Sequence, residues 1–534
     1  MGMYLNIGNA GFQSVRKGFY VDKSGLISFM NGTLGTKDKL TCVSRPRRFG
    51  KSFATQMLCA YYDKSCDSRN LFCDLKIAGD PAFEKFLNQY DVIYLDITWF
   101  ISTEKDVRNT VAYLQEQVIK ELSVVYPPVK KEDSLPVMLA KVAEMTGHRF
   151  IIIIDEWDAL FREVQSDIDL QKEYLQLLRG LFKSSLTDKM IEAAYMTGIL
   201  PIKKYGTQSA LTDFREYTML RPKKLAEYVG FTEAEVKKLC RQYNMDFEET
   251  QRWYDGYSFS RAKSIYSPNS VVQAIKNEEF GDYWTETETY ESLKFYISLN
   301  EDGLKDAVIS MLGGERCRIN TRTFQNDMSN IKSKDDVLTL LVHLGYLAYD
   351  SDRNEVYIPN QEVADEFKSA VEYSGWQGVS TALRKSEELL DATLQENAQE
   401  VADRIDEIHL ANTSVLAYNN ENALSCVITI AYYVAQKDYI MIREMPSGKG
   451  FADIAFLPRK HVDKPAMLIE LKWDKSAQGA ISQIREKNYA GVLDEYRGNL
   501  LLVGINYNKK DKKHECIIER YTSQKPPKEI FGRI

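Results

Sequence analysis

Gly50, Lys51 and Ser52 stand next to one another between a short apolar run, residues 40–43, and the helix-forming run SFATQML. Backbone N–H groups at the start of a helix bind phosphate, a lysine ammonium neutralises β- and γ-phosphate oxygens, and a serine hydroxyl is a ligand for Mg²⁺. The segment RPRRFGKS, residues 45–52, therefore predicts a phosphate-binding loop for ATP and Mg²⁺, with Ser52 on the metal. The residues expected to bind the cofactor are Arg47, Arg48, Phe49, Gly50, Lys51, Ser52 and Phe53.

Arg45 stands where the general form of such a loop has glycine. A side chain at that position restricts the conformations open to the backbone. The loop sequence alone therefore leaves nucleotide binding undecided, and other residues must support it.

Asp155 and Glu156 directly follow the apolar run FIIII. Because adjacent side chains at a strand end point in opposite directions, we expect Asp155 to share the Mg²⁺ with Ser52, and Glu156 to face the attacking water as general base. Thr197 ends the next strand-like run and is expected to place its hydroxyl near the γ-phosphate. Lys51, Glu156 and Thr197 are thus the expected catalytic residues for hydrolysis. The alternative is a buried strand whose acidic end only faces water.

Asp453, Glu470 and Lys472 form a second group of chemically capable side chains near the end of the chain. Asp453 lies in the strand-like run GKGFADIAFL, and the other two lie in AMLIELK. Residues two apart on a strand project from the same face, so the three side chains converge if these strands are antiparallel neighbours.

Two carboxylates beside a lysine suit metal-dependent hydrolysis of a phosphodiester. Asp453 and Glu470 are the expected Mg²⁺ ligands, with the carbonyl oxygen of Leu471 as a third ligand. Lys472 is expected to orient the attacking water or to stabilise the charged transition state. The alternative is a chance D…ExK pattern whose charges only face water.

Short apolar runs alternate with helix-length segments in the first part of the chain, which predicts a parallel sheet flanked by helices. The four runs are residues 40–43, 92–97, 150–154 and 193–196. The second run lies between the phosphate loop and the Asp155 strand, as in the branch of P-loop ATPases that uses a catalytic glutamate. We therefore expect an α/β P-loop NTPase core over residues 1–202.

Changes of pattern divide the rest of the chain. Charged helical patterns at residues 203–300 predict a helical lid. An amphipathic helix followed by a hairpin at residues 301–374 predicts a winged-helix-like region. A charged helical segment, residues 380–408, and a return to alternating strands and helices predict a separate α/β domain over residues 375–534.

The composition is that of an ordinary globular protein, with 534 residues, 44% hydrophobic and 27% charged. No apolar run approaches the roughly 20 residues that span a bilayer, and the start lacks the features of a signal peptide, so a cytoplasmic protein without a membrane partner is expected. Eight scattered cysteines without a CxxC pair argue against a zinc ribbon or a disulfide framework.

The formal charge of −7 gives no overall attraction for DNA or RNA. A nucleic-acid partner would have to be bound by local basic patches, for which residues 45–48, 221–224 and 509–513 are candidates. Such patches are more often solvated surface.

The sequence resembles the AAA-ATPase-like proteins of bacteria that carry a C-terminal PD-(D/E)XK nuclease domain. The resemblance covers nearly the whole chain. It rests on FYVDKS (19–24), RPRRFGKS (45–52), IDEWD (154–158), TGI (197–199), GFTEAEV (230–236) and WYDGY (253–257).

The resemblance carries several implications. An arginine-rich loop is usual in this family, so Arg45 is a family trait, and Trp157 stands where tyrosine is more common. Residues 20–23 are expected near the nucleotide. The last domain is expected to be restriction-endonuclease-like, with the helix at 477–489 after its ExK strand, and Glu421 is expected to add a further acidic ligand to the metal site.

Two functions remain open. The first is an ATPase that controls a metal-dependent nuclease acting on DNA or RNA. The alternative is an ATP-driven switch or scaffold whose C-terminal domain binds nucleic acid or protein without cleaving it, and a purely structural interaction protein is a weaker third option. Because related ATPases often work as oligomers, a homo-oligomer is a further expectation.

Overall fold

The computed structural model describes residues 2–521 apart from 130–131, 133, 203–210, 260–261, 285–288, 300–302, 313, 326–330, 374–376, 413–423, 425–426, 429–430, 433, 436–437, 448–449, 460–461, 488–492, 494–495 and 497. The chain forms two compact units. Unit 1 comprises Met1–Gly303 and Arg316–Glu366, and unit 2 comprises Leu304–Glu315 and Phe367–Ile534. No helix in the described part of the chain is long and apolar enough to cross a membrane.

Unit 1 is built on a five-stranded parallel sheet with the strand order β2-β3-β4-β1-β5. Its strands are β1 (Leu40–Ser44), β2 (Asp91–Asp96), β3 (Phe150–Asp155), β4 (Ile191–Gly198) and β5 (Arg215–Tyr217). The predicted α/β core with a parallel sheet is confirmed, and all four predicted strands are present. Strand β5 was not predicted, because its sequence REY begins with an exposed arginine and forms no apolar run.

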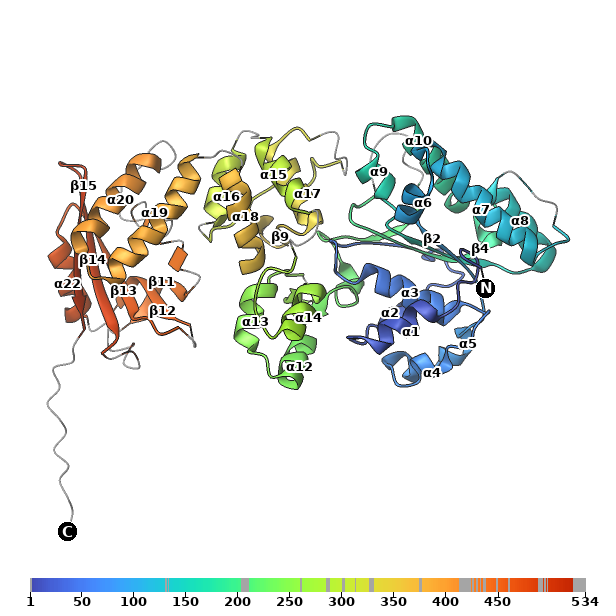
Figure 1. Ribbon diagram of the computed structural model, residues 1–534, viewed down its shortest axis with the longest axis horizontal. Coiled ribbons are helices and arrows are strands. Elements are labelled where there is room, and N and C mark those ends of the chain that lie inside the picture. The colour runs from blue at the N-terminus through green and yellow to red at the C-terminus, as the bar shows by residue number, and fades with distance from the viewer. Residues whose placement is uncertain are drawn as a thin grey trace, which may run out of the picture. The chain divides into compact units, whose positions relative to one another are not determined.

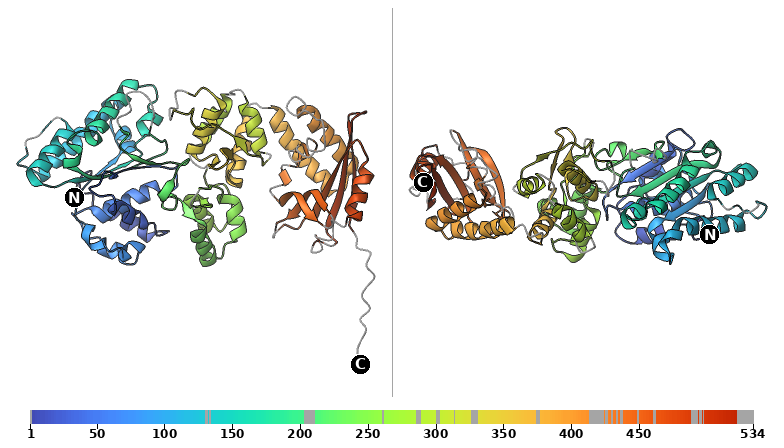
Figure 2. Two further views of the ribbon diagram at one scale, coloured as in Figure 1. Left: turned by 180° about the vertical axis from the view of Figure 1, so that it is seen from behind. Right: turned by 90° about the horizontal axis from the view of Figure 1, so that it is seen from above.

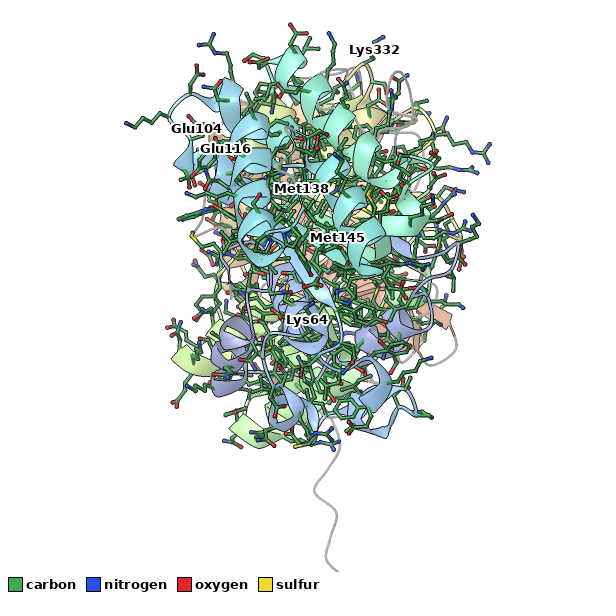
Figure 3. The ribbon with its side chains drawn as sticks, turned by 90° about the vertical axis from the view of Figure 1, so that its right-hand side faces the viewer. Lys64, Glu104, Glu116, Met138, Met145 and Lys332 are labelled. Carbon is green, nitrogen blue, oxygen red and sulfur yellow. The ribbon has the colours of Figure 1, made fainter. Side chains whose placement is uncertain are left out.

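Helices cover both faces of this sheet, which explains why β1 and β3 are buried at every position. Alternate residues such as Cys42, Ile152 and Met196 pack with helices α7, α8 and α10 in one core. Figure 1 and the left view of Figure 2 show α6 to α10 over this face and α1 to α5 over the other. Figure 3 shows α7 and α8 side by side, with Met138 and Met145 labelled on α8.

These helices are α1 (Ala10–Lys17), α2 (Gly25–Asn31), α3 (Lys51–Tyr62), α4 (Arg69–Phe72), α5 (Phe83–Phe86), α6 (Ile97–Thr103), α7 (Thr110–Val125), α8 (Leu135–Thr146), α9 (Ala159–Glu163), α10 (Ile168–Phe182) and α11 (Thr187–Met190). Short 3-10 helices are η1 (Lys76–Gly79), η2 (Val107–Asn109) and η4 (Lys223–Leu225).

A small helical group follows β5 in unit 1. It contains β6 (Phe231–Thr232), α12 (Glu233–Tyr243), α13 (Phe247–Tyr254), β7 (Ile265–Tyr266) and α14 (Pro268–Asn277). Helix α12 begins where it does because Thr232 and Glu235 form a reciprocal capping box, which satisfies two N–H groups at the helix start.

Short helices and a three-stranded antiparallel sheet, order β8-β10-β9, come next in the chain. The elements are α15 (Thr289–Ser298), α16 (Leu304–Leu312), β8 (Cys317–Arg318), α17 (Lys334–Leu344), β9 (Ala348–Asp350), β10 (Glu355–Tyr357) and α18 (Gln361–Tyr373). Every residue of α17 from Asp336 to His343 is buried. This helix therefore has no exposed face of its own along most of its length.

Glu362, in the first turn of α18, is a buried carboxylate in unit 1. Its Oε1 atom accepts hydrogen bonds from the backbone N–H groups of Tyr283 and Trp284, each at 2.8 Å. Burial raises the pKa of Glu362 to about 8, although these hydrogen bonds oppose the shift. The folded protein therefore holds this proton more tightly than the unfolded chain does.

A stability change with pH follows from this shift. The protonated Glu362 makes its full contribution to the free energy of unfolding below the ordinary pKa of a glutamic acid, about 4.3. This contribution is lost as the pH rises towards 8. Glutamine resembles the protonated acid and keeps the acceptor oxygen. At pH 9, Glu362→Gln should therefore have a free energy of unfolding about 2 kcal/mol above that of the wild type. At pH 5 the two proteins should be nearly equal in stability.

Urea unfolding at the two pH values measures this difference. Glu116→Gln, on an exposed position of α7, is the control and should alter the unfolding free energy equally at both. Parallel pH profiles for the wild type and Glu362→Gln would contradict the assignment.

Unit 2 is built on a mixed five-stranded sheet with the order β11-β12-β13-β14-β15, in which only β13 and β14 are parallel. The strands are β11 (Tyr439–Ser447), β12 (Gly450–Pro458), β13 (Ala466–Trp473), β14 (Leu500–Asn508) and β15 (Lys513–Arg520). Helices α19 (Gln377–Leu394) and α20 (Ala398–Asn412) pack on one face. Helix α22 (Ala477–Glu486) packs on the other.

The helical segment predicted at residues 380–408 is in fact two helices, α19 and α20. Glu396, between them, has a left-handed backbone with φ of +60°, which ends the first helix. The predicted separate α/β domain with a mixed set of strands and helices is confirmed.

Candidate functional site

The phosphate loop connects β1 to α3 at the carboxyl edge of the parallel sheet. Gly50 occupies the N-cap position of α3 with φ of +88°, a left-handed conformation that favours glycine. No heavy atom lies within 4 Å of a Cβ built there, so the backbone conformation rather than lack of space requires the glycine. The turn brings the free N–H groups at the start of α3 to this edge, where an anion can bind.

Lys51 is the first residue of α3, and its side chain is almost completely buried. Its Nζ atom donates to the carbonyl oxygen of Pro46 at 3.1 Å and lies 3.2 Å from Oε1 of Glu156. Ser52 and Phe53, the next two residues, are exposed. Phe53 is 53% exposed, so its side chain reaches solvent beside the loop.

Asp155 ends β3 and is buried on the α3 side of the sheet. The hydroxyl groups of Thr55 and Tyr94 each lie 3.4 Å from its Oδ2 atom. Burial raises the pKa of Asp155 to about 6, while the Ser52 hydroxyl and the Lys51 ammonium oppose the shift. The structure therefore brings Asp155, Ser52 and Lys51 together at the start of α3.

Glu156 lies just beyond the end of β3, and its backbone is left-handed with φ of +51°. Its Oε1 atom lies 3.2 Å from Nζ of Lys51. Its expected role as the general base that faces the attacking water stays a prediction. Burial tends to raise the pKa of Glu156, but the positive charges of Lys51 and Arg162 outweigh it and lower the pKa.

Arg162 of α9 was missed by the sequence analysis. Its Nη2 atom lies 2.6 Å from Oε2 of Glu156, and its Nε atom lies 3.1 Å from Oδ2 of Asp158. The four-residue spacing from Asp158 is a signal that the sequence did contain, because such pairs share one side of a helix. The contact with Glu156, a residue with a left-handed backbone outside α9, has no such signal in the sequence.

Thr197 lies on β4, beside the position of Asp155 on β3. Its side chain is fully buried, and within the described residues its hydroxyl has no hydrogen-bond partner. Its carbonyl oxygen accepts from the N–H of Trp157 at 2.9 Å. At Gly198, a Cβ would lie only 2.4 Å from Oδ1 of Asp158, so the buried Asp158 side chain leaves no room for a larger residue.

Arg45, at the start of the loop, points into the protein interior. The Arg45 guanidinium is fully buried and donates to the carbonyl oxygens of Ser44, Tyr217 and Leu225 at 2.8, 3.0 and 3.3 Å. Burial lowers the pKa of Arg45 to about 10. Arg45 therefore anchors the loop to the segment after β5, which explains how the loop tolerates a side chain in the place of glycine.

The three residues before Gly50 differ in their surroundings. Arg47 contributes positive charge near Glu156. Arg48 has a left-handed backbone with φ of +65° and donates to the carbonyl oxygen of Tyr283 at 3.0 Å. Phe49 is buried against the ring of Tyr257, so only its backbone is available to a ligand.

Residues 20–23, which the resemblance places near the nucleotide, pack on the helices around the loop. The Tyr20 hydroxyl contacts Met57 of α3, and Lys23 pairs with Glu235 of α12. The first contact links the N-terminal segment to the phosphate-loop helix α3, and the second links it to α12.

The second site lies in unit 2, on the α22 face of the mixed sheet. Strands β12 and β13 are antiparallel neighbours, which is the arrangement that convergence of the three side chains requires. The Leu471 N–H donates to Oδ2 of Asp453 at 2.7 Å, and Nζ of Lys472 donates to Oε1 of Glu470 at 3.0 Å. Gln483 of α22 also donates to Glu470. Asp453, Glu470 and Lys472 therefore come together.

Glu470 is buried, and among the described residues its Oε2 atom has no hydrogen-bond partner. Burial, followed by the negative charge of Asp453, raises the pKa of Glu470 to about 7, against the effect of Lys472. A buried carboxylate oxygen without a partner is costly unless a proton or a metal ion binds it. The chemistry of this pair of acids thus fits a divalent cation.

Glu421, the further acidic ligand expected from the resemblance, lies outside the described residues, as does Tyr489. Within the described part of the chain, no group of three or more His, Cys, Asp or Glu side chains is arranged to hold a metal ion. Two carboxylates and one backbone carbonyl are what the described residues offer at the unit 2 site.

A parallel sheet with a phosphate loop and paired acids at its carboxyl edge, together with a mixed sheet that carries an Asp-Glu-Lys group, defines an ATPase-like domain joined to a nuclease-like domain. Residues 6–207 match the family described as predicted AAA-ATPase. Residues 419–516 match the PD-(D/E)XK nuclease superfamily. The chain thus combines an N-terminal AAA-ATPase-like domain with a C-terminal domain of the PD-(D/E)XK nuclease superfamily.

Three solved structures are similar to this chain in part. ORC2 of Aeropyrum pernix has 11% identity and a TM-score of 0.30, covering 68% of this chain and 98% of its own. DnaA of Aquifex aeolicus has 12% identity and a TM-score of 0.26, covering 79% and 97%. PCH-2 of C. elegans has 13% identity and a TM-score of 0.23, covering 68% and 73%. Nothing about function follows at these TM-scores, and no curated protein matches the chain.

Proposed function

We propose that this protein binds and hydrolyses ATP with Mg²⁺ in unit 1, and that ATP turnover controls a metal-dependent nuclease site in unit 2. The observation that carries the proposal is the meeting of Lys51, Asp155 and Glu156 at the start of α3. A lysine, a metal-binding acid and a general base at one helix N-terminus are the parts that hydrolysis of a nucleoside triphosphate needs.

The roles in unit 1 follow from the contacts. The N–H groups of the loop and the ammonium of Lys51 would bind the β- and γ-phosphates, and Phe53 is exposed beside them. Ser52 and Asp155 would hold Mg²⁺, which neutralises charge on the phosphates when bound. Glu156 would take the proton of the attacking water, and the Thr197 hydroxyl would respond to the γ-phosphate.

The proposed roles in unit 2 rest on the buried Oε2 atom of Glu470, which has no hydrogen-bond partner among the described residues, and on the side chains beside it. Asp453, Glu470 and the carbonyl oxygen of Leu471 would hold the cation, which polarises the scissile phosphate when bound. Lys472, fixed on Glu470, would stabilise negative charge that develops on the phosphate. Nucleic acid, either DNA or RNA, is the proposed substrate.

Control of one site by the other is inferred from their order in one chain. Helix α18 contains the last residues of unit 1 and continues into unit 2.

The test is calorimetric titration of the purified chain with MgATP, followed by ATP turnover and by incubation with single- and double-stranded DNA and RNA, each with and without ATP. We expect saturable ATP binding, turnover that requires Mg²⁺, and cleavage of one substrate class that depends on ATP. Absence of ATP binding would contradict the proposal for unit 1. Absence of cleavage across all substrates would favour a switch or scaffold.

A further inference from the structure

Arg162 is a nearly buried cation with carboxylates on both sides of its guanidinium. Only 7% of its side chain is exposed. Its Nη2 atom lies 2.6 Å from Glu156, and its Nε atom lies 3.1 Å from Asp158. A planar guanidinium can hold two groups in fixed directions at once, which a flexible ammonium cannot do equally well.

Asp158, the second carboxylate beside Arg162, is itself held by the residues that follow β4. It is 1% exposed and accepts hydrogen bonds from the backbone N–H groups of Ile199 and Leu200, at 3.2 and 2.8 Å. These two residues directly follow Thr197 and Gly198 at the end of β4. A chain of hydrogen bonds therefore runs from the end of β4 through Asp158 and Arg162 to the Glu156 carboxylate.

Glu156 has a second cationic partner in Lys51, 3.2 Å away. In the proposed function the ammonium of Lys51 binds phosphate oxygens, so the two anions compete for it. Arg162 does not lie on the loop, and its hold on Glu156 is independent of that competition.

We propose that Arg162 is a positioning residue of the ATPase, which holds the Glu156 carboxylate in place and ties it to the end of β4. This inference rests on the proposed function of unit 1 and adds to it the element that keeps the general base aligned when Lys51 is bound to phosphate. Arg162 itself contacts no phosphate in this scheme.

The kinetic test compares Arg162→Ala and Arg162→Lys with the wild type. We expect Arg162→Ala to lower kcat by about 10- to 100-fold and to leave KM and the Kd for MgATP within about 3-fold. Arg162→Lys keeps the positive charge but loses the planar guanidinium that holds two groups at once. Its kcat should therefore lie between those of Arg162→Ala and the wild type. Arg69→Ala, which removes an exposed ion pair with Glu84, is the control and should leave both constants unchanged.

Two outcomes would overturn the inference. An unchanged kcat would mean that Arg162 only forms an ion pair within its helix. If Arg162→Ala weakens MgATP binding by 10-fold or more in a Glu156→Gln background, where the base is absent, Arg162 contacts the nucleotide itself.

A second measurement guards against loss of folding in Arg162→Ala, which removes the ion-pair partner of the buried Asp158. In a double-mutant cycle of melting temperatures, Glu156→Gln and Arg162→Lys together should lower the melting temperature by less than the sum of their separate effects. Strict additivity would contradict the pairing. A wild type that binds MgATP but turns none over would contradict the proposed function without affecting this cycle.

Discussion

Glu156→Gln should lower kcat for ATP hydrolysis by about 10²- to 10⁴-fold, because it removes the base that takes the proton of the attacking water. The same change should leave the affinity for MgATP equal or slightly higher, because Lys51 loses the carboxylate that lies 3.2 Å from it. Glutamine keeps the size of the side chain and can still accept a hydrogen bond from Arg162.

Lys51→Ala is the matched comparison for this prediction. It removes the ammonium that the phosphates need, so it should weaken MgATP binding by about 10-fold or more as well as abolish turnover. Calorimetry and steady-state turnover on the two variants separate binding from chemistry. Turnover in Glu156→Gln close to that of the wild type would assign the base to another residue.

Asp453→Ala and Lys472→Ala should each lower nuclease activity by about 10²-fold or more, without changing ATP turnover in unit 1. The first removes a cation ligand, and the second removes the charge that stabilises the transition state. Asp453→Ala should also raise the Mg²⁺ concentration needed for half-maximal cleavage, whereas Lys472→Ala should not.

Lys475→Ala is the control for the second site. Lys475 is exposed and lies three residues beyond Lys472, outside β13, so cleavage should remain at the wild-type level. Cleavage that persists in both Asp453→Ala and Lys472→Ala would remove the nuclease assignment, and the activity would then belong to another part of the chain or to a contaminant.

Features that depend on local sequence were predictable. Strand β3 is apolar at every position before Asp155, and β13 carries Glu470 and Lys472 two residues apart, so their placement follows from the periodicity of a strand. The turn at Gly50 follows from the conformational freedom of glycine. These features require no knowledge of distant contacts.

Features set by tertiary contacts were not predictable. Strand β5 forms because β1 offers it an open edge, and not because its three residues favour a strand. The left-handed conformation of Glu156 and its contact with Arg162 do not follow from the alternation of a strand. The role of Arg45 became apparent only from carbonyl oxygens more than a hundred residues away in sequence.

Arg45 has a mechanical consequence for the loop. Its positive charge is shielded from water and solvated by the carbonyl dipoles of Ser44, Tyr217 and Leu225. Moving the loop away from residues 217–225 would remove two of these three acceptors from a buried cation, which is unfavourable unless water replaces them. We therefore expect a ligand that displaces the loop to move residues 217–225 with it.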